Sequence, residues 1–199
     1  MRIIGGIASG ITIFAPKGLA VRPTPDLVRQ AVFNSLGERI VGASILELFA
    51  GSGALSLESL SRGAIRAVCV ELNPHHSTFI RKNLAATKLP ASALEIRTQD
   101  VFPALRQLAH AGQQFDLILA DPPYGQKNVN CRSESLAQQI LDLADLRSVL
   151  KSDGLFVLGH SKRDTLTIPS EWHDRKVLKH GDSIMRFMEL TNTAPNSAC

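Results

Sequence analysis

Short apolar runs alternate with amphipathic segments along most of this chain. From Ala43 onward, runs apolar enough for buried strands lie near residues 44–49, 66–70, 94–97, 115–120 and 155–159. Strands that alternate with helical segments favour a parallel sheet with helices on both faces. Two later runs, 173–179 and 184–190, are joined by His180-Gly181-Asp182, which is typical of a hairpin turn. The pattern therefore predicts an α/β fold with a doubly wound, mostly parallel sheet.

The first forty residues differ from this pattern. Residues 1–40 predict a small hairpin and then an amphipathic helix, one side of which carries Val28, Ala31, Val32 and Leu36. We expect residues 41–190 to form the main domain, and the polar residues 191–199 to form a frayed tail. A length of 199 residues also favours one domain with at most a small appendage.

The chain is mildly basic, with a net charge of +4 and a pI near 9.2, which is compatible with a polyanionic partner. Most of the basic excess precedes residue 41. Arg22 and Arg29 lie on either side of the first turn of the N-terminal helix, which we expect Thr24 to cap. A solvated helix face and a nucleic-acid footprint both explain this arrangement, and both interpretations stay open.

Membrane and metal-binding patterns are absent from the sequence. There is no run of eighteen apolar residues and no signal-peptide pattern at the N-terminus, so we expect a soluble, cytoplasmic protein. Cys69, Cys131 and Cys199 are far apart, and the histidines lack the spacing of zinc ligands. We therefore expect no metal site and no disulfide framework, which fits a reducing compartment.

A glycine-rich turn follows the first predicted strand. It comprises Phe49-Ala50-Gly51-Ser52-Gly53, and a helix is expected to follow it. A strand, such a turn and a helix are typical of nucleotide-binding α/β domains. A dinucleotide site would have a third glycine where this chain has Ser56, which argues against a bound pyrophosphate. Glu47 also argues against a phosphate, and suits a ligand with positive charge such as a sulfonium or an α-amino group.

Acidic residues follow the next two predicted strands. Glu71 comes about twenty residues after the glycine-rich turn, where such folds place the carboxylate that accepts the ribose hydroxyls. A solvated strand end is the alternative for Glu71. Asp100, which precedes the apolar pair Val101 and Phe102, is a candidate for holding the amino group and ring of an adenine. The alternative for Asp100 is the cap of the next helix.

The sequence Asp121-Pro122-Pro123-Tyr124 directly follows the apolar run 115–120. Two prolines cannot continue a central strand, so the chain must leave the sheet there and expose the residues beside them. The Asp121 carboxylate can accept hydrogen bonds from an exocyclic amine, and the Tyr124 ring can stack on a planar base. We interpret these residues as a pocket for methylating the amino group of a nucleobase. An ordinary proline turn is the alternative.

Four features follow one another in the sequence: the glycine-rich turn, Glu71, Asp100 and Asp121-Pro122-Pro123-Tyr124. In this order they resemble the S-adenosyl-L-methionine-dependent amino-methyltransferases. Further segments resemble the bacterial 16S ribosomal RNA guanine-N2 methyltransferase family, namely residues 2–6, 22–36, 48–55, 58–64 and 179–183. The resemblance extends from Arg2 to about Leu190. It implies a Rossmann-like methyltransferase domain with a seven-stranded sheet, to which the closing hairpin adds two antiparallel strands.

The resemblance implies methylation of the N2 amine of a guanine in 16S ribosomal RNA, at the position conventionally numbered 966, with S-adenosyl-L-methionine as cofactor. It implies a small-subunit ribosomal particle as partner and a monomeric enzyme. Asp121 and the Pro122 carbonyl would orient the amine, while Tyr124 would stack on the guanine. The residues implied to hold the cofactor are Glu47, Phe49, Ala50, Gly51, Ser52, Gly53, Glu71, Asp100 and Val101. Those implied to contact RNA are Arg22, Thr24 and Arg29.

Other interpretations stay open. Residues 7–14 carry no charge, whereas the corresponding hairpin of the family usually carries several basic residues, so RNA contact through it is an open question. An adenine-N6 methyltransferase of DNA or RNA would share Asp-Pro-Pro-Tyr and the cofactor, although sequence-specific DNA enzymes usually add a target-recognition domain. The last alternative is a non-catalytic nucleotide-binding assembly factor. Glu71, Asp121 and Tyr124 argue against it, because a binding module has no need of an acceptor at a strand end.

Overall fold

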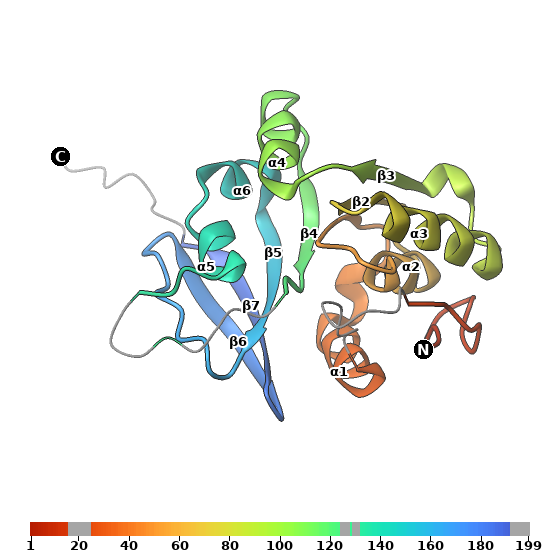
Figure 1. The fold of residues 1–199 in the computed structure, drawn as a ribbon, viewed down its shortest axis with the longest axis horizontal. Helices are drawn as coiled ribbons and strands as arrows, with labels where there is room; N and C mark the ends of the chain where they lie inside the picture. The colour runs from red at the N-terminus through yellow and green to blue at the C-terminus, as the bar shows by residue number, and fades with distance from the viewer. Residues whose placement is uncertain (16–24, 124–127, 129–131, 192–199) are drawn as a thin grey trace.

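A single mixed sheet of seven strands organises the protein (Figure 1). The computed structural model describes residues 1–15, 25–123, 128 and 132–191. The strands are β1 (Ser44–Leu48), β2 (Arg66–Glu71), β3 (Leu94–Thr98), β4 (Phe115–Ala120), β5 (Leu150–Ser161), β6 (Trp172–His180) and β7 (Ser183–Leu190). Their order is β3-β2-β1-β4-β5-β7-β6, with β1 to β5 parallel and β7 antiparallel to both of its neighbours. The predicted fold class and closing hairpin are confirmed.

One helix precedes the parallel strands and the others connect them. The helices are α1 (Asp26–Leu36), α2 (Ala54–Ser61), α3 (Pro74–Thr87), α4 (Val101–His110), α5 (Leu136–Leu141) and α6 (Ala144–Val149), with short 3-10 turns at Gly37–Ile40 and Ala91–Ala93. Asn73 caps α3 by accepting a hydrogen bond from His75 N, and Pro74 occupies the first helical position. Across the described ranges, none of these helices is long and apolar enough to cross a membrane.

Helices cover both faces of the sheet, and its central strands are buried on both sides. One buried cluster, which includes Leu57, joins α1, α2 and α3 to one face. A second cluster, which includes Leu105, joins α4, α5 and α6 to the other face. Successive residues of β1 enter different clusters, with Ile45 in the first and Leu46 in the second. The continuous apolar run of β1 thus reflects two buried faces.

Strand β5 begins earlier than predicted. Pairing with β4 starts at Leu150 and resumes at Leu155 after a register shift. The intervening segment Lys151-Ser152-Asp153 is polar. A bulge of this kind breaks the alternation by which a strand is recognised in sequence.

The direction of winding reverses between β1 and β4. The chain builds β2 and β3 on one side of β1 and then adds β4 and β5 on the other side. In open α/β sheets, ligands bind outside the carboxyl ends of the strands at such a reversal. We refer to the margin where β1 to β5 end as the carboxyl edge. It is the first place to look for a site.

The N-terminal segment packs against the same core as the sheet. Arg2 and Thr12 form an isolated antiparallel bridge, as expected of a small hairpin. Ile3 and Ile13 are fully buried in the cluster that contains Leu57. The division into residues 1–40, 41–190 and 191–199 stays a prediction.

Helix α1 begins one residue later than predicted. Pro25 occupies the N-cap position with an extended ψ of 145°, and forms no side-chain cap bond. Arg29 N donates the first intrahelical hydrogen bond to Pro25 O at 3.0 Å. The prediction that Thr24 caps this helix is therefore wrong, because the helical turn closes on the following residue. Thr24 itself lies outside the described residues.

Candidate active site

The predicted functional acids lie at the ends of neighbouring strands. Glu71 is the last residue of β2, Asp100 follows β3, and Asp121 follows β4. The glycine-rich turn, residues 49–53, follows β1. Because the order is β3-β2-β1-β4 and the strands are parallel, these four segments form one row along the carboxyl edge. The sheet therefore brings together segments that are far apart in the sequence.

The glycine-rich turn bends through backbone conformations that favour glycine. Phe49, Gly51 and Gly53 have φ values of 58°, 55° and 74°. Such a conformation costs a non-glycine residue roughly 1–2 kcal/mol, so the surrounding structure must hold Phe49 in place. A Cβ on Gly53 would lie 2.8 Å from Ile80 Cγ2, so this glycine lets α2 pack closely against α3. A Cβ on Gly51 would have open space around it, which leaves this backbone accessible to a ligand.

Glu47 is buried beside the start of α2. Its carboxylate accepts hydrogen bonds from Leu55 N at 3.2 Å and from Ser56 N at 2.9 Å, where the helix dipole favours a negative charge. Burial raises the pKa of Glu47, and the hydrogen bonds from Ser56 offset part of this effect. Both carboxylate oxygens accept hydrogen bonds from the start of α2, and the residue is only 2% exposed. This geometry does not support the predicted direct contact with a cationic ligand.

Glu71 connects β2 to the glycine-rich turn. One carboxylate oxygen accepts a hydrogen bond from Gly51 N at 2.7 Å. The other accepts from Asn73 N at 2.8 Å and lies 3.2 Å from His76 Nδ1. Glu71 is 7% exposed, so the alternative of a solvated strand end is wrong. An ionised carboxylate has about four acceptor positions, and these three partners leave capacity for a hydroxyl group.

Asp100 caps the next helix. Its Oδ1 accepts a hydrogen bond from Phe102 N at 2.9 Å at the start of α4, as the alternative interpretation proposed. A cap uses one acceptor position, so it does not exclude a second contact with a ligand amine. Val101 is 4% exposed and belongs to the core, whereas Phe102 is only partly buried. The adenine role of Asp100 and Val101 stays a prediction.

The carboxylate of Asp121 lies against the bare backbone of β5. A Cβ added to Gly159 would overlap Asp121 Oδ1 and would stand 3.2 Å from Met185 Sδ. Gly159 therefore provides the space that the carboxylate occupies. We did not identify Gly159 from the sequence, although a glycine inside an apolar strand is a sign of close backbone approach. Pro122 is buried and Pro123 is exposed, while Tyr124 lies outside the described residues.

Arg29 is not on an exposed helix face. The side chain is fully buried, and its guanidinium donates to Met1 Sδ at 3.2 Å, to Arg2 O, and to Asp26 Oδ1 at 3.1 Å. Its Nε lies 3.8 Å from a carboxylate oxygen of Glu58. The prediction that Arg29 contacts RNA is therefore wrong in this structure, because these contacts hold it inside the protein. Arg22 and Thr24, predicted with it, lie outside the described residues.

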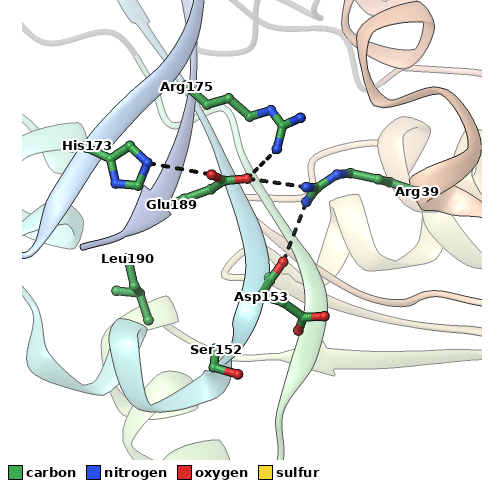
Figure 2. A pocket seen from close by; sticks show the side chains of 8 residues that line it. Arg39, Ser152, Asp153, His173, Arg175, Glu189 and Leu190 are labelled. Atoms are coloured by element: carbon green, nitrogen blue, oxygen red, sulfur yellow. Dashed lines mark hydrogen bonds and ion pairs between the residues drawn. The ribbon is translucent and has the colours of Figure 1, made fainter. Parts of the chain in front are cut away.

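A cavity of about 550 Å³ lies away from the carboxyl edge, beside the start of β5 and the end of β7. It is lined by Arg39, Ser152, Asp153, Gly154, His173, Arg175, Glu189 and Leu190. Figure 2 shows three basic side chains converging on Glu189, whose carboxylate lies 2.7 Å from Arg175, 3.3 Å from Arg39 and 3.5 Å from His173. Arg175 holds the pKa of Glu189 below its usual value. The lining holds two arginines and the two carboxylates of Glu189 and Asp153, so its charges are nearly balanced, and the cavity is not part of the candidate site.

Comparisons with known proteins agree with this architecture. The family described as Conserved hypothetical protein 95 matches residues 1–189. Ribosomal RNA small subunit methyltransferase D of Escherichia coli (strain K12) is 33% identical over 180 residues, which cover 89% of this chain and 84% of that protein. The protein of the same name from Haemophilus influenzae is 30% identical over 172 residues, covering 86% and 84%.

A solved structure supports the same assignment. The structure of yhhF from Escherichia coli superposes with a TM-score of 0.76 at 30% identity, covering 96% of this chain and 97% of that one. The match therefore includes the N-terminal segment as well as the sheet. This chain belongs to the Conserved hypothetical protein 95 family, which is the family of the ribosomal RNA small subunit methyltransferase D proteins.

Proposed function

We propose that this protein transfers a methyl group from S-adenosyl-L-methionine to the N2 amine of a guanine in 16S ribosomal RNA. The observation that carries the proposal is the row of segments at the carboxyl edge, in which Asp121 directly follows β4, the strand next to β1 and its glycine-rich turn. The relatives named ribosomal RNA small subunit methyltransferase D support ribosomal RNA as the substrate. The resemblance described above supports guanine N2 and the position numbered 966.

The residues of the edge suit the proposed methyl donor. S-adenosyl-L-methionine supplies an electrophilic methyl group on a sulfonium sulfur. Glu71 has acceptor capacity left for the ribose hydroxyls, each hydrogen bond to its charge contributing roughly 1.5–3 kcal/mol. Gly51 offers open backbone beside it. Asp100 lies at the end of the neighbouring strand, where it can accept from the adenine amine.

Asp121 orients the amine that is methylated. The lone pair of the guanine amine is delocalised into the ring, so this nitrogen is a poor nucleophile. The Asp121 carboxylate and the Pro122 carbonyl would accept hydrogen bonds from the two N–H groups of this amine. These hydrogen bonds favour tetrahedral nitrogen and direct its lone pair at the methyl carbon. The reacting atoms must align at roughly 3 Å, so orientation supplies much of the rate. Asp121 acts as an orienting acceptor, because the amine loses its proton readily only after methylation.

The guanine must leave its stack, or already lie in a loop, before it can reach this carboxylate. Tyr124, which follows the two prolines, would then stack on the ring, an interaction worth roughly 1–3 kcal/mol. We further propose that the substrate is RNA within a small-subunit particle and that the enzyme acts as a monomer.

The test is nucleoside analysis by mass spectrometry. Small-subunit particles from cells that lack this protein are incubated with the protein and S-adenosyl-L-methionine, and their RNA is digested. We expect N2-methylguanine to be formed at one position. Formation of N6-methyladenine, or methylation of duplex DNA in a parallel reaction, would favour the adenine-N6 alternative instead. No methylation of any nucleoside would favour a non-catalytic assembly factor.

A further inference from the structure

Exposed basic side chains gather where the β6–β7 hairpin meets the carboxyl edge. Lys162 and Arg163 directly follow β5, and Lys179 lies near the end of β6. All three side chains are exposed. We refer to them as the hairpin-tip cations. In Figure 1 the blue hairpin projects beyond the end of β5.

Strand register places the hairpin-tip cations close to Asp121. Gly159, against which the Asp121 carboxylate lies, pairs with Met185. The neighbouring residue of β7, Ile184, pairs with His160 of β5 on one side and with Lys179 of β6 on the other. With strands about 4.8 Å apart and about 3.3 Å per residue, the backbones of Lys162 and Lys179 each lie about 10 Å from Gly159, and the backbone of Lys179 lies about 15 Å from that of Asp121. Lys162 N also donates to Asp182 O at 2.7 Å, which ties the segment after β5 to the hairpin turn.

The charges of the hairpin-tip cations are available to a partner. Within the part of the chain that the structure describes, Lys162, Arg163 and Lys179 form no ion pair. Two other cations of the same hairpin are neutralised, since Arg175 pairs with Glu189 and Arg186 pairs with Asp174. The hairpin therefore has uncompensated positive charge at the end nearest Asp121, in addition to Lys176 in the middle of β6, whose Nζ donates to Ser35 Oγ at 2.9 Å.

The turn of the hairpin also carries an acid. The side chain of Asp182 is exposed and forms no ion pair within the described ranges. Three exposed cations and one exposed carboxylate leave a net charge of about +2 at this surface, whereas the carboxylate of Asp164, which follows Arg163, is buried. A surface of this sign and size suits the phosphates of a nucleic-acid backbone.

We propose that the hairpin-tip cations bind the RNA phosphates that flank the methylated guanine. This inference rests on the proposed function. A nucleotide drawn out of its stack into a pocket must be held by the backbone on either side of it, and Lys and Arg contacts to phosphate supply such positioning without reading sequence. Arg29, which we expected to contact RNA, is buried. The hairpin-tip cations would make the RNA contact that we had expected of Arg29.

The test is the salt dependence of RNA binding by the full-length protein. The triple variant Lys162→Gln, Arg163→Gln and Lys179→Gln is compared with wild type on in vitro transcribed 16S ribosomal RNA. Each lost phosphate contact lowers the slope of log affinity against log salt by about 0.7, so the slope should fall by about 2 and the affinity by about tenfold or more. S-adenosyl-L-methionine affinity should not change. Asp182→Asn should strengthen RNA binding, a gain that damage to the fold cannot produce.

A matched control removes the same charge elsewhere. Arg81, Lys82 and Lys88 are exposed on or next to the later half of α3, which runs back from the carboxyl edge. Their triple Gln variant should keep a slope near that of wild type. Equal losses in the two triple variants, or no gain from Asp182→Asn, would overturn the proposed surface. If only the hairpin variant loses affinity but wild type forms no N2-methylguanine in particles, the proposed reaction fails while the RNA surface stands.

Discussion

Three acids at or near the carboxyl edge accept hydrogen bonds that stabilise the fold, whatever ligand the edge binds. Glu71 holds the glycine-rich turn, Glu47 holds the start of α2, and Asp100 caps α4. Spacing in the sequence predicted where these acids would lie. Spacing could not predict which backbone N–H groups would donate hydrogen bonds to these acids, because the donors depend on the conformation of the turns. The difference matters most for Glu47, whose carboxylate faces the helix and is buried.

Gly159 gives a test of how Asp121 is positioned. Gly159→Ala should push the carboxylate out of its place beside β5, because the new methyl group would overlap Asp121 Oδ1. A misplacement of about 1 Å costs about 100-fold in rate, so single-turnover methyl transfer should fall by about that factor. S-adenosyl-L-methionine affinity, measured by calorimetric titration, should stay within a few-fold of wild type.

Gly154→Ala is the matched control in the same strand. Its new Cβ would lie 2.7 Å from Leu150 Cδ1 and 2.9 Å from Lys151 O, so it is equally crowded but far from Asp121. This variant should lose thermal stability and keep its single-turnover rate. Similar rates for the two variants would show that Gly159 does not position the carboxylate.

At the scale of elements, Glu58 of α2 holds the N-terminal hairpin. Its carboxylate accepts hydrogen bonds from Ile4 N and Gly5 N, both at 2.8 Å, and from Arg62 Nε at 2.7 Å. Arg29 of α1 lies 3.8 Å away on the other side. The sequence predicted the hairpin and the helix separately. Their docking could not be predicted, because nothing in local periodicity indicates that a buried acid will join three elements.

Glu58→Gln should destabilise the protein strongly. It removes the negative charge and leaves Arg29 buried, and breaking a buried pair in this way typically costs about 3–5 kcal/mol. Urea denaturation should show this loss in the free energy of unfolding. Glu95→Gln is the control, since Glu95 pairs with Arg97 at 2.6 Å but is half exposed. It should cost less than about 1 kcal/mol, and an equally small loss for Glu58→Gln would contradict the proposed docking role.

At the scale of the whole molecule, the sequence was sufficient for the parallel strands and for the residues that end them. Apolar runs such as 115–120 are long and continuous because both faces are buried, which makes them easy to recognise. Contacts between segments distant in sequence were not predictable, as Gly159 against Asp121 and Arg29 beside Glu58 show. The polar bulge at the start of β5 was also missed, because it breaks the strand pattern.

The central claim is that two acids at the carboxyl edge have different roles, one in cofactor binding and the other in methyl transfer. We propose that Glu71 binds the cofactor, whereas Asp121 acts on the amine as the nitrogen becomes tetrahedral. An interaction that strengthens in the transition state appears in turnover more than in ground-state affinity. Glu71 is the last residue of β2 and Asp121 follows β4, on either side of the glycine-rich turn that follows β1.

The most direct test measures cofactor affinity and single-turnover methyl transfer together in Glu71→Ala and Asp121→Ala, on unmodified small-subunit particles. For Glu71→Ala we expect S-adenosyl-L-methionine affinity to fall by about tenfold or more, through loss of its charged hydrogen bonds. For Asp121→Ala we expect transfer at saturating cofactor to fall by about 100-fold or more, with affinity changed only a few-fold. Near-normal transfer by Asp121→Ala at saturating cofactor would contradict the account.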